Sequence, residues 1–138
     1  MTSKIAFIVP GEPKGKGRPR FTKSGHTYTP NATREYEDLI KAEYLQAYRG
    51  RCFEAGAPIR MRIYAEFGIA KSNSKAIREK KLAGEILPTK KPDVDNIIKV
   101  VADALNGLAY ADDTQLVYVS ATKKYGDNPH ISVFLERI

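Results

Sequence analysis

The alternation of apolar and polar residues over residues 59–69 is the feature that most restricts the fold. Every second side chain here is apolar, which is the period of a β-strand with one buried face and one face in water. Strands of this kind are typical of an antiparallel sheet that is covered on one side. We therefore expect a sheet with helices packed on one face. The alternating apolar residues are Ile59, Met61, Ile63, Ala65, Phe67 and Ile69.

The rest of the chain supplies helices and partner strands for this sheet. Apolar or aromatic residues at every fourth position predict an amphipathic helix that begins at residues 30–33 and ends near Gly50. Further strands are expected at residues 5–10, 116–125 and 131–137, and further helices at residues 74–82 and 96–105. No repeat or linker separates these elements. We expect one small α+β domain over residues 1–138, with a mixed, largely antiparallel sheet.

Positive charge exceeds negative charge and is clustered. Lys and Arg number 23 against 16 Asp and Glu, a formal net charge of +7 at pH 7. Residues 11–30 are rich in glycine, proline and cations, and we expect them to form an exposed, irregular arm. Clustered cations indicate a polyanionic partner, although they also occur on ordinary solvated surfaces. The cations predicted to contact such a partner are Lys14, Lys16, Arg18, Arg20, Lys23, Lys90 and Lys91.

The cysteine count and the hydropathy restrict the location of the protein. Cys52 is the only cysteine and cannot form an intrachain disulfide, which favours a reducing, intracellular setting. No stretch approaches the ~20 apolar residues of a membrane span, and the N-terminal apolar run is too short for a signal peptide. We therefore expect a cytoplasmic protein without a membrane partner.

Two aspartates precede the helix predicted at residues 96–105. Pro92 favours a boundary between loop and helix just before Asp93 and Asp95. A carboxylate at such a boundary can cap the helix by accepting hydrogen bonds from backbone N–H groups. Capping explains one aspartate but not both, so a further role is expected.

A second acidic pair, Asp112 and Asp113, follows the same helix. We expect the chain to fold back there and to bring this pair toward Asp93 and Asp95. Several carboxylates in one pocket repel one another and need protons or a cation. Oxygen ligands without His or Cys favour Mg²⁺, with Mn²⁺ as a substitute, over Zn²⁺. Such a metal site suits the hydrolysis of a phosphodiester.

Lys99 lies one helical turn beyond Asp95, on the polar side of the same helix. There it could stabilise charge on a phosphate or orient a water molecule. It could equally form an ion pair with Asp95 or Asp103 on the helix surface. The residues alone leave both alternatives open.

This segment resembles the signature of the RusA-type Holliday-junction resolvases. The signature combines D-x-D-N-x-x-K, D-x-L and D-D-x-Q-V/I at fixed spacing, which is far more specific than a bare D-x-D. The resemblance is close over residues 91–125 and general elsewhere. The matching runs are Asp93-Val94-Asp95-Asn96-Ile97-Ile98-Lys99, Asp103-Ala104-Leu105 and Tyr110-Ala111-Asp112-Asp113-Thr114-Gln115-Leu116-Val117.

The resemblance implies a small α+β endonuclease that resolves four-way DNA junctions by paired, symmetric nicks. It assigns the essential metal-binding acids to Asp93, Asp95 and Asp113, with Asp112 as an accessory acid, and a catalytic role to Lys99. It also implies a homodimer with two Mg²⁺-dependent sites. The polyanion is then branched DNA.

Two other functions fit parts of this pattern. One is a junction-binding protein without catalysis, which the presence of every acid and of the lysine of the signature argues against. The other is a D-x-D transferase that uses a metal-bound nucleotide, but the sequence has no recognisable nucleotide-binding βαβ unit.

Overall fold

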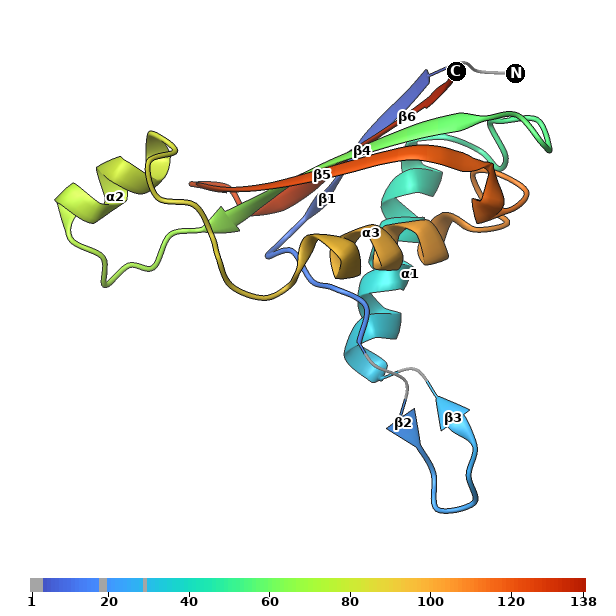
Figure 1. The fold of residues 1–138 in the computed structure, drawn as a ribbon, viewed down its shortest axis with the longest axis horizontal. Helices are drawn as coiled ribbons and strands as arrows, with labels where there is room; N and C mark the ends of the chain where they lie inside the picture. The colour runs from blue at the N-terminus through green and yellow to red at the C-terminus, as the bar shows by residue number, and fades with distance from the viewer. Residues whose placement is uncertain (1–3, 18–19, 29) are drawn as a thin grey trace.

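A four-stranded mixed sheet forms the centre of the fold (Figure 1). The computed structural model describes residues 4–17, 20–28 and 30–138. The strand order is β1–β6–β4–β5, in which β4 is antiparallel to β6 and parallel to β5, and β1 is antiparallel to β6. The four strands are β1 (Lys4–Pro10), β4 (Ile59–Gly68), β5 (Leu116–Gly126) and β6 (His130–Arg137). The predicted α+β class and the largely antiparallel sheet are confirmed.

The alternation of apolar and polar residues in β4 sets the two faces of the sheet. In β4 the apolar side chains from Ile59 to Phe67 are buried, and Arg60, Arg62 and Tyr64 between them are partly or fully exposed. Neighbouring β6 buries Ile131 and its alternate apolar residues in the same way. The buried faces form one core, and the opposite face of the sheet stays open to water.

Two helices cover the buried face, as expected. They are α1 (Asn31–Ala47) and α3 (Val94–Leu105), which contact each other beneath the sheet. The short helix α2 (Lys75–Leu82) lies beyond the end of the sheet and buries none of its residues (Figure 1). No helix in the described parts of the chain is long and apolar enough to cross a membrane.

Residues 11–30 differ from the exposed, irregular arm that the sequence predicted. Residues 13–17 pack against the helices, and Pro13 is buried. Only the following part projects, as a hairpin of β2 (Arg20–Phe21) and β3 (Thr27–Tyr28) (Figure 1). Glycine and proline therefore mark a close backbone approach in the first part and a turn in the second.

Candidate active site

The entrance of α3 presents two exposed carboxylates. Asp93 occupies the N-cap position, and its backbone oxygen accepts a hydrogen bond from the N–H of Ile97 at 3.0 Å. Its carboxylate makes no capping hydrogen bond, and Asp95 lies in the first helical turn. The positive end of the helix dipole favours negative charge at both positions. Because capping does not occupy these carboxylates, both remain available to a cation.

A hollow of about 590 Å³ opens beside this helix entrance. It brings cations of the glycine-rich segment and of the loop before α3 to the same place as the Asp93 carboxylate. A surface that combines these groups can hold a phosphate near an acidic ligand set. The lining residues are Pro13, Lys14, Gly15, Lys16, Gly17, Lys91, Pro92, Asp93 and Asn96.

Gly15 lies in the wall of this hollow, where the backbone closely approaches α3 and the loop before it. A Cβ atom at this position would lie 2.9 Å from the Cβ atoms of both Pro92 and Asn96, which is closer than real Cβ contacts. The N–H of the next residue, Lys16, donates to the backbone oxygen of Asn96 at 3.0 Å. This contact was not predicted from the sequence. The glycines that lie between cations in this segment are the feature that could have indicated it.

Lys16 is bound within the protein. Its Nζ lies 2.8 Å from Glu37 Oε1 on α1 and 3.2 Å from Asp103 Oδ2 on α3, and its side chain is only 16% exposed. Burial lowers the pKa of Lys16, but hydrogen bonds and charge attraction from the two acids outweigh it, so this pKa lies above the ordinary value. Lys16 thus ties residues 13–17 to both helices.

The partner of Asp103 is therefore Lys16 and not Lys99, and of the two alternatives for Lys99 the surface ion pair does not form in the described chain. Lys99 is exposed and forms an ion pair neither with Asp95 nor with Asp103. Its ammonium group is available for a ligand, one turn beyond Asp95.

The exit of α3 is built differently. Asp112 begins a short 3-10 turn, η1 (Asp113–Gln115), and its carboxylate accepts a hydrogen bond from Thr114 Oγ1 at 2.8 Å. Within the described residues the carboxylate of Asp113 forms no hydrogen bond or ion pair, and its side chain is partly exposed. Asp112 therefore stabilises the turn, and Asp113 is the acid left available.

Gln115 fixes this turn to the rest of the protein. It is 6% exposed, and its Nε2 donates to the backbone oxygens of Glu54 and Ala57 at 2.8 and 3.0 Å. Its Oε1 accepts from the N–H groups of Ala111 and Asp112 at 3.0 and 3.2 Å. A buried amide with all these bonds acts as a positioning residue for the acidic pair. Gln115 belongs to the signature run at residues 110–117, but the sequence alone does not indicate its role.

The two acidic pairs lie at opposite ends of α3. This helix has 12 residues, so it is about 18 Å long at 1.5 Å per residue. The loop before α3 lies near the end of β5, because Lys123 Nζ donates to the backbone oxygen of Lys90. The turn with Asp112 and Asp113 leads directly into the beginning of β5 (Figure 1).

The expectation that all four aspartates converge is thus wrong for a single chain. Among the described residues, which include all four, no group of three or more His, Cys, Asp or Glu side chains is arranged to hold a metal ion. The physical reason is the rigid helix between the pairs. Near the exit, burial raises the pKa of Tyr110, and the negative charges of Asp113, Asp103 and Asp112 raise it further.

A basic cluster flanks the loop before α3. Lys81 Nζ lies 4.4 Å from the centre of the Tyr125 ring, and Lys90 Nζ lies 5.7 Å from the same ring. Lys123 Nζ lies 5.3 Å from the centre of the Phe67 ring. In the described parts of the chain none of the three lysines is paired with a carboxylate. Aromatic rings hold these ammonium groups in place while leaving their charge uncompensated.

The remaining predicted DNA contacts lie on different surfaces. Lys14 is exposed at the hollow, Lys91 joins it there, and Lys23 is exposed in the hairpin. Arg18 lies outside the described residues, and so does the side chain of Arg20. The contacts themselves stay predictions.

Comparison with known proteins identifies the family. Residues 10–136 match the family described as Endodeoxyribonuclease RusA. The chain belongs to the RusA family. The match spans the glycine-rich segment, both ends of α3, strands β4 and β5 and nearly all of β6, so the family covers the whole site. The resemblance that the signature residues indicated is confirmed, and it assigns the chain to a family of endonucleases that act on DNA.

Two relatives extend this RusA-family match. The chain is 34% identical over 137 residues to a Bacillus subtilis (strain 168) protein named Uncharacterized protein YqaN, with 97% of this chain and 96% of that protein covered. It is 26% identical over 129 residues to a protein of Lactococcus phage r1t named Crossover junction endodeoxyribonuclease rusA, with 93% of this chain and 86% of that protein covered.

Proposed function

We propose that the protein is a Mg²⁺-dependent endonuclease that resolves four-way DNA junctions by paired, symmetric nicks. The observation that carries this proposal is that a RusA-family chain combines exposed signature carboxylates at the entrance of α3 with a hollow lined by cations. The name of the phage relative, a crossover junction endodeoxyribonuclease, supports a branched substrate. A metal requirement is consistent with carboxylates that have no hydrogen-bonded partner in the described chain.

The residues around the hollow would have different roles in the cleavage of the phosphodiester. Lys14 and Lys91 bind and orient the phosphate backbone, and Lys99 lies one turn from Asp95 to stabilise charge on the scissile phosphate. Asp93 and Asp95 supply oxygen ligands. A bound Mg²⁺ would lower the pKa of a water molecule and offset negative charge on the phosphate.

Asp113 joins this set only if a second copy of the chain supplies it. The strand β5 lies at the edge of the sheet, and its free edge can pair with another strand. Antiparallel pairing of two β5 strands about a two-fold axis puts the beginning of one beside the end of the other. Asp113 at the beginning of one β5 then approaches the partner's loop before α3, which Lys123 holds at the end of its β5. We therefore propose a homodimer with two shared sites.

Cleavage of a synthetic four-way junction tests the activity. With Mg²⁺ present we expect symmetric nicks on opposite strands at the branch, and little cleavage of linear duplex of the same sequence. The Asp93→Asn variant should bind the junction but not nick it. Nicking by this variant at the wild-type rate would refute the assignment, and binding without nicking by the wild-type protein in Mg²⁺ and Mn²⁺ would instead favour a non-catalytic junction-binding protein.

Subunit mixing tests the shared site. In a mixed dimer of an Asp93→Asn chain and an Asp113→Asn chain, a shared arrangement leaves one site with no substitution and concentrates both substitutions in the other. We expect the mixture to recover single nicks, whereas each variant alone is inactive. If each chain builds its own site, the mixture stays inactive, which would contradict the proposed dimer.

A further inference from the structure

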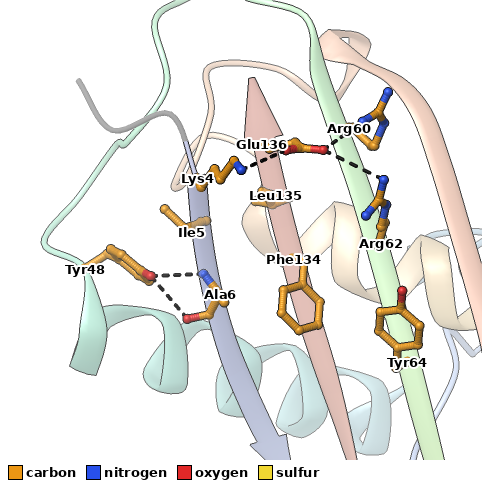
Figure 2. Close-up of a pocket in the computed structure, with 10 residues that line it drawn as sticks. All are labelled: Lys4, Ile5, Ala6, Tyr48, Arg60, Arg62, Tyr64, Phe134, Leu135 and Glu136. Carbon is orange, nitrogen blue, oxygen red and sulfur yellow. Dashed lines mark hydrogen bonds and ion pairs between the residues drawn. The ribbon is translucent and has the colours of Figure 1, made fainter. Parts of the chain in front are cut away.

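The face of the sheet that turns away from the helices carries a hollow that the proposed active site does not use. Its volume is about 480 Å³, within the range that suits a small ligand or a single nucleotide. Figure 2 shows that its walls come from β1, β6 and β4, with Tyr48 after the end of α1 on the rim. The hydroxyl of Tyr48 donates to the backbone oxygen of Ala6 and accepts from its N–H, which closes the edge of β1 there.

Two aromatic rings form the apolar side of this hollow. Tyr64 on β4 and Phe134 on β6 meet edge to face, with ring centres 5.6 Å apart and an angle of 81° between the rings. They are 43% and 42% exposed and lie against each other, so they form one aromatic patch on the surface. Exposed rings on an open sheet face are a surface on which nucleic acid bases stack.

Three cations surround one carboxylate at the other side of the hollow. Arg60 Nη1 lies 2.8 Å from Glu136 Oε1, whereas Lys4 and Arg62 each lie 3.9 Å from this carboxylate (Figure 2). The hydrogen bond from Arg60 lowers the pKa of Glu136, so this group stays negative. The cluster still carries two uncompensated positive charges, and Arg62 is outside hydrogen-bond range of Glu136. An anion therefore complements this side of the hollow.

The geometry points to an unpaired nucleotide of a DNA strand as the ligand. Its base lies against Tyr64 and Phe134, and its phosphate contacts Arg62 and Lys4. Arg62 and Tyr64 lie two positions apart on the same face of β4, about 7 Å along the strand. The phosphate of one nucleotide therefore contacts Arg62 while its base contacts Tyr64. A second copy of the chain fits less well, because two-fold pairing of this face opposes two positively charged clusters. The inference rests on the proposed function only in that the substrate is DNA.

Binding of a fluorescently labelled oligothymidylate, followed by anisotropy in EDTA, tests this site without cleavage. Replacement of both rings in Tyr64→Thr/Phe134→Thr keeps residues that favour strands and removes the stacking surface. We expect the dissociation constant to rise at least about fivefold, the smallest loss that follows removal of one stacking contact. The Arg62→Gln variant should reduce the slope of log K against log salt by about 0.7.

Conservative and distant variants serve as controls. Tyr64→Phe keeps the ring and should bind as the wild type does. Leu45→Gln on α1 and Arg51→Gln remove an exposed apolar side chain and an exposed guanidinium elsewhere and should have no effect.

Two outcomes would overturn the inference. One is unchanged oligothymidylate binding by Tyr64→Thr/Phe134→Thr. The other is conversion of a dimer to a monomer by the same variant in analytical ultracentrifugation, which would assign this face to a second copy. Because the assay needs no metal, failure of junction nicking by the wild-type protein would refute the proposed function and leave this result intact.

Discussion

The entrance and the exit of α3 both present a pair of aspartates, but they hold them in different ways. At the entrance, the start of the helix alone positions Asp93 and Asp95, and no side chain binds their carboxylates within the described residues. At the exit, the buried amide of Gln115 and the hydroxyl of Thr114 fix the turn that carries the acids. Substitutions of Asp93 or Asp95 should therefore affect function alone. Substitutions in the turn at the exit should affect either function or stability, depending on the residue.

The largest expected effect separates the two acids of the exit. Asp113→Asn removes a carboxylate that has no bond within the described chain, so junction nicking should fall about a thousandfold, as when one group of a catalytic set is lost. Its free energy of unfolding should stay within about 0.5 kcal/mol of the wild type. Asp112→Asn keeps an oxygen that can accept from Thr114 and should reduce nicking less than tenfold, which single-turnover rates can measure. Equal losses in the two variants would contradict the distinction.

A second prediction concerns the buried amide of the exit. Gln115→Leu leaves the N–H groups of Ala111 and Asp112 without their acceptor and removes both donor bonds. Unsatisfied buried groups cost about 1–3 kcal/mol each, so we expect a loss of roughly 3 kcal/mol in urea unfolding. Thr114→Val, which removes an exposed hydroxyl of the same turn, should cost under about 1 kcal/mol. A similar cost in the two variants would show that Gln115 does not anchor the turn.

The parts of the fold with a strong local pattern could be predicted from the sequence. The strand predicted at residues 59–69 is β4 at Ile59–Gly68, and the helix predicted at residues 96–105 is α3 at Val94–Leu105. Gly107 directly follows the C-cap residue Asn106 and has a positive φ of 77°, which favours glycine at the end of a helix. Apolar periodicity and end signals act over a few residues, so sequence alone contains them.

Long-range contacts of the site could not be predicted in the same way. The ion pairs of Lys16 with Glu37 and Asp103 join three segments distant in sequence, and nothing local distinguishes Lys16 from its exposed neighbour Lys14. The separation of the acidic pairs also depends on where β5 begins after the helix. A signature lists residues that belong together but does not show whether one chain or two chains bring them together.

The smallest expected effect tests how residues 13–17 are held at the entrance. Lys16→Gln leaves the two partly buried acids without their cation and should lower the free energy of unfolding by roughly 2 kcal/mol at pH 7, between the values for exposed and buried pairs. The pKa of Lys16 is raised in the folded state, so its contribution is complete below the ordinary pKa of 10.5 and is lost as the pH rises through the folded value. The difference between wild type and variant should therefore shrink at strongly alkaline pH.

Urea denaturation of both proteins at neutral and alkaline pH measures this difference. Lys14→Gln is the matched control, because Lys14 is exposed two residues away and should change stability by less than about 0.5 kcal/mol at either pH. A difference for Lys16→Gln that stays constant or grows with pH would mean that packing of the lysine stem, and not its charge, holds residues 13–17 against α3. In that case the hollow beside Asp93 would keep its shape without the ion pairs.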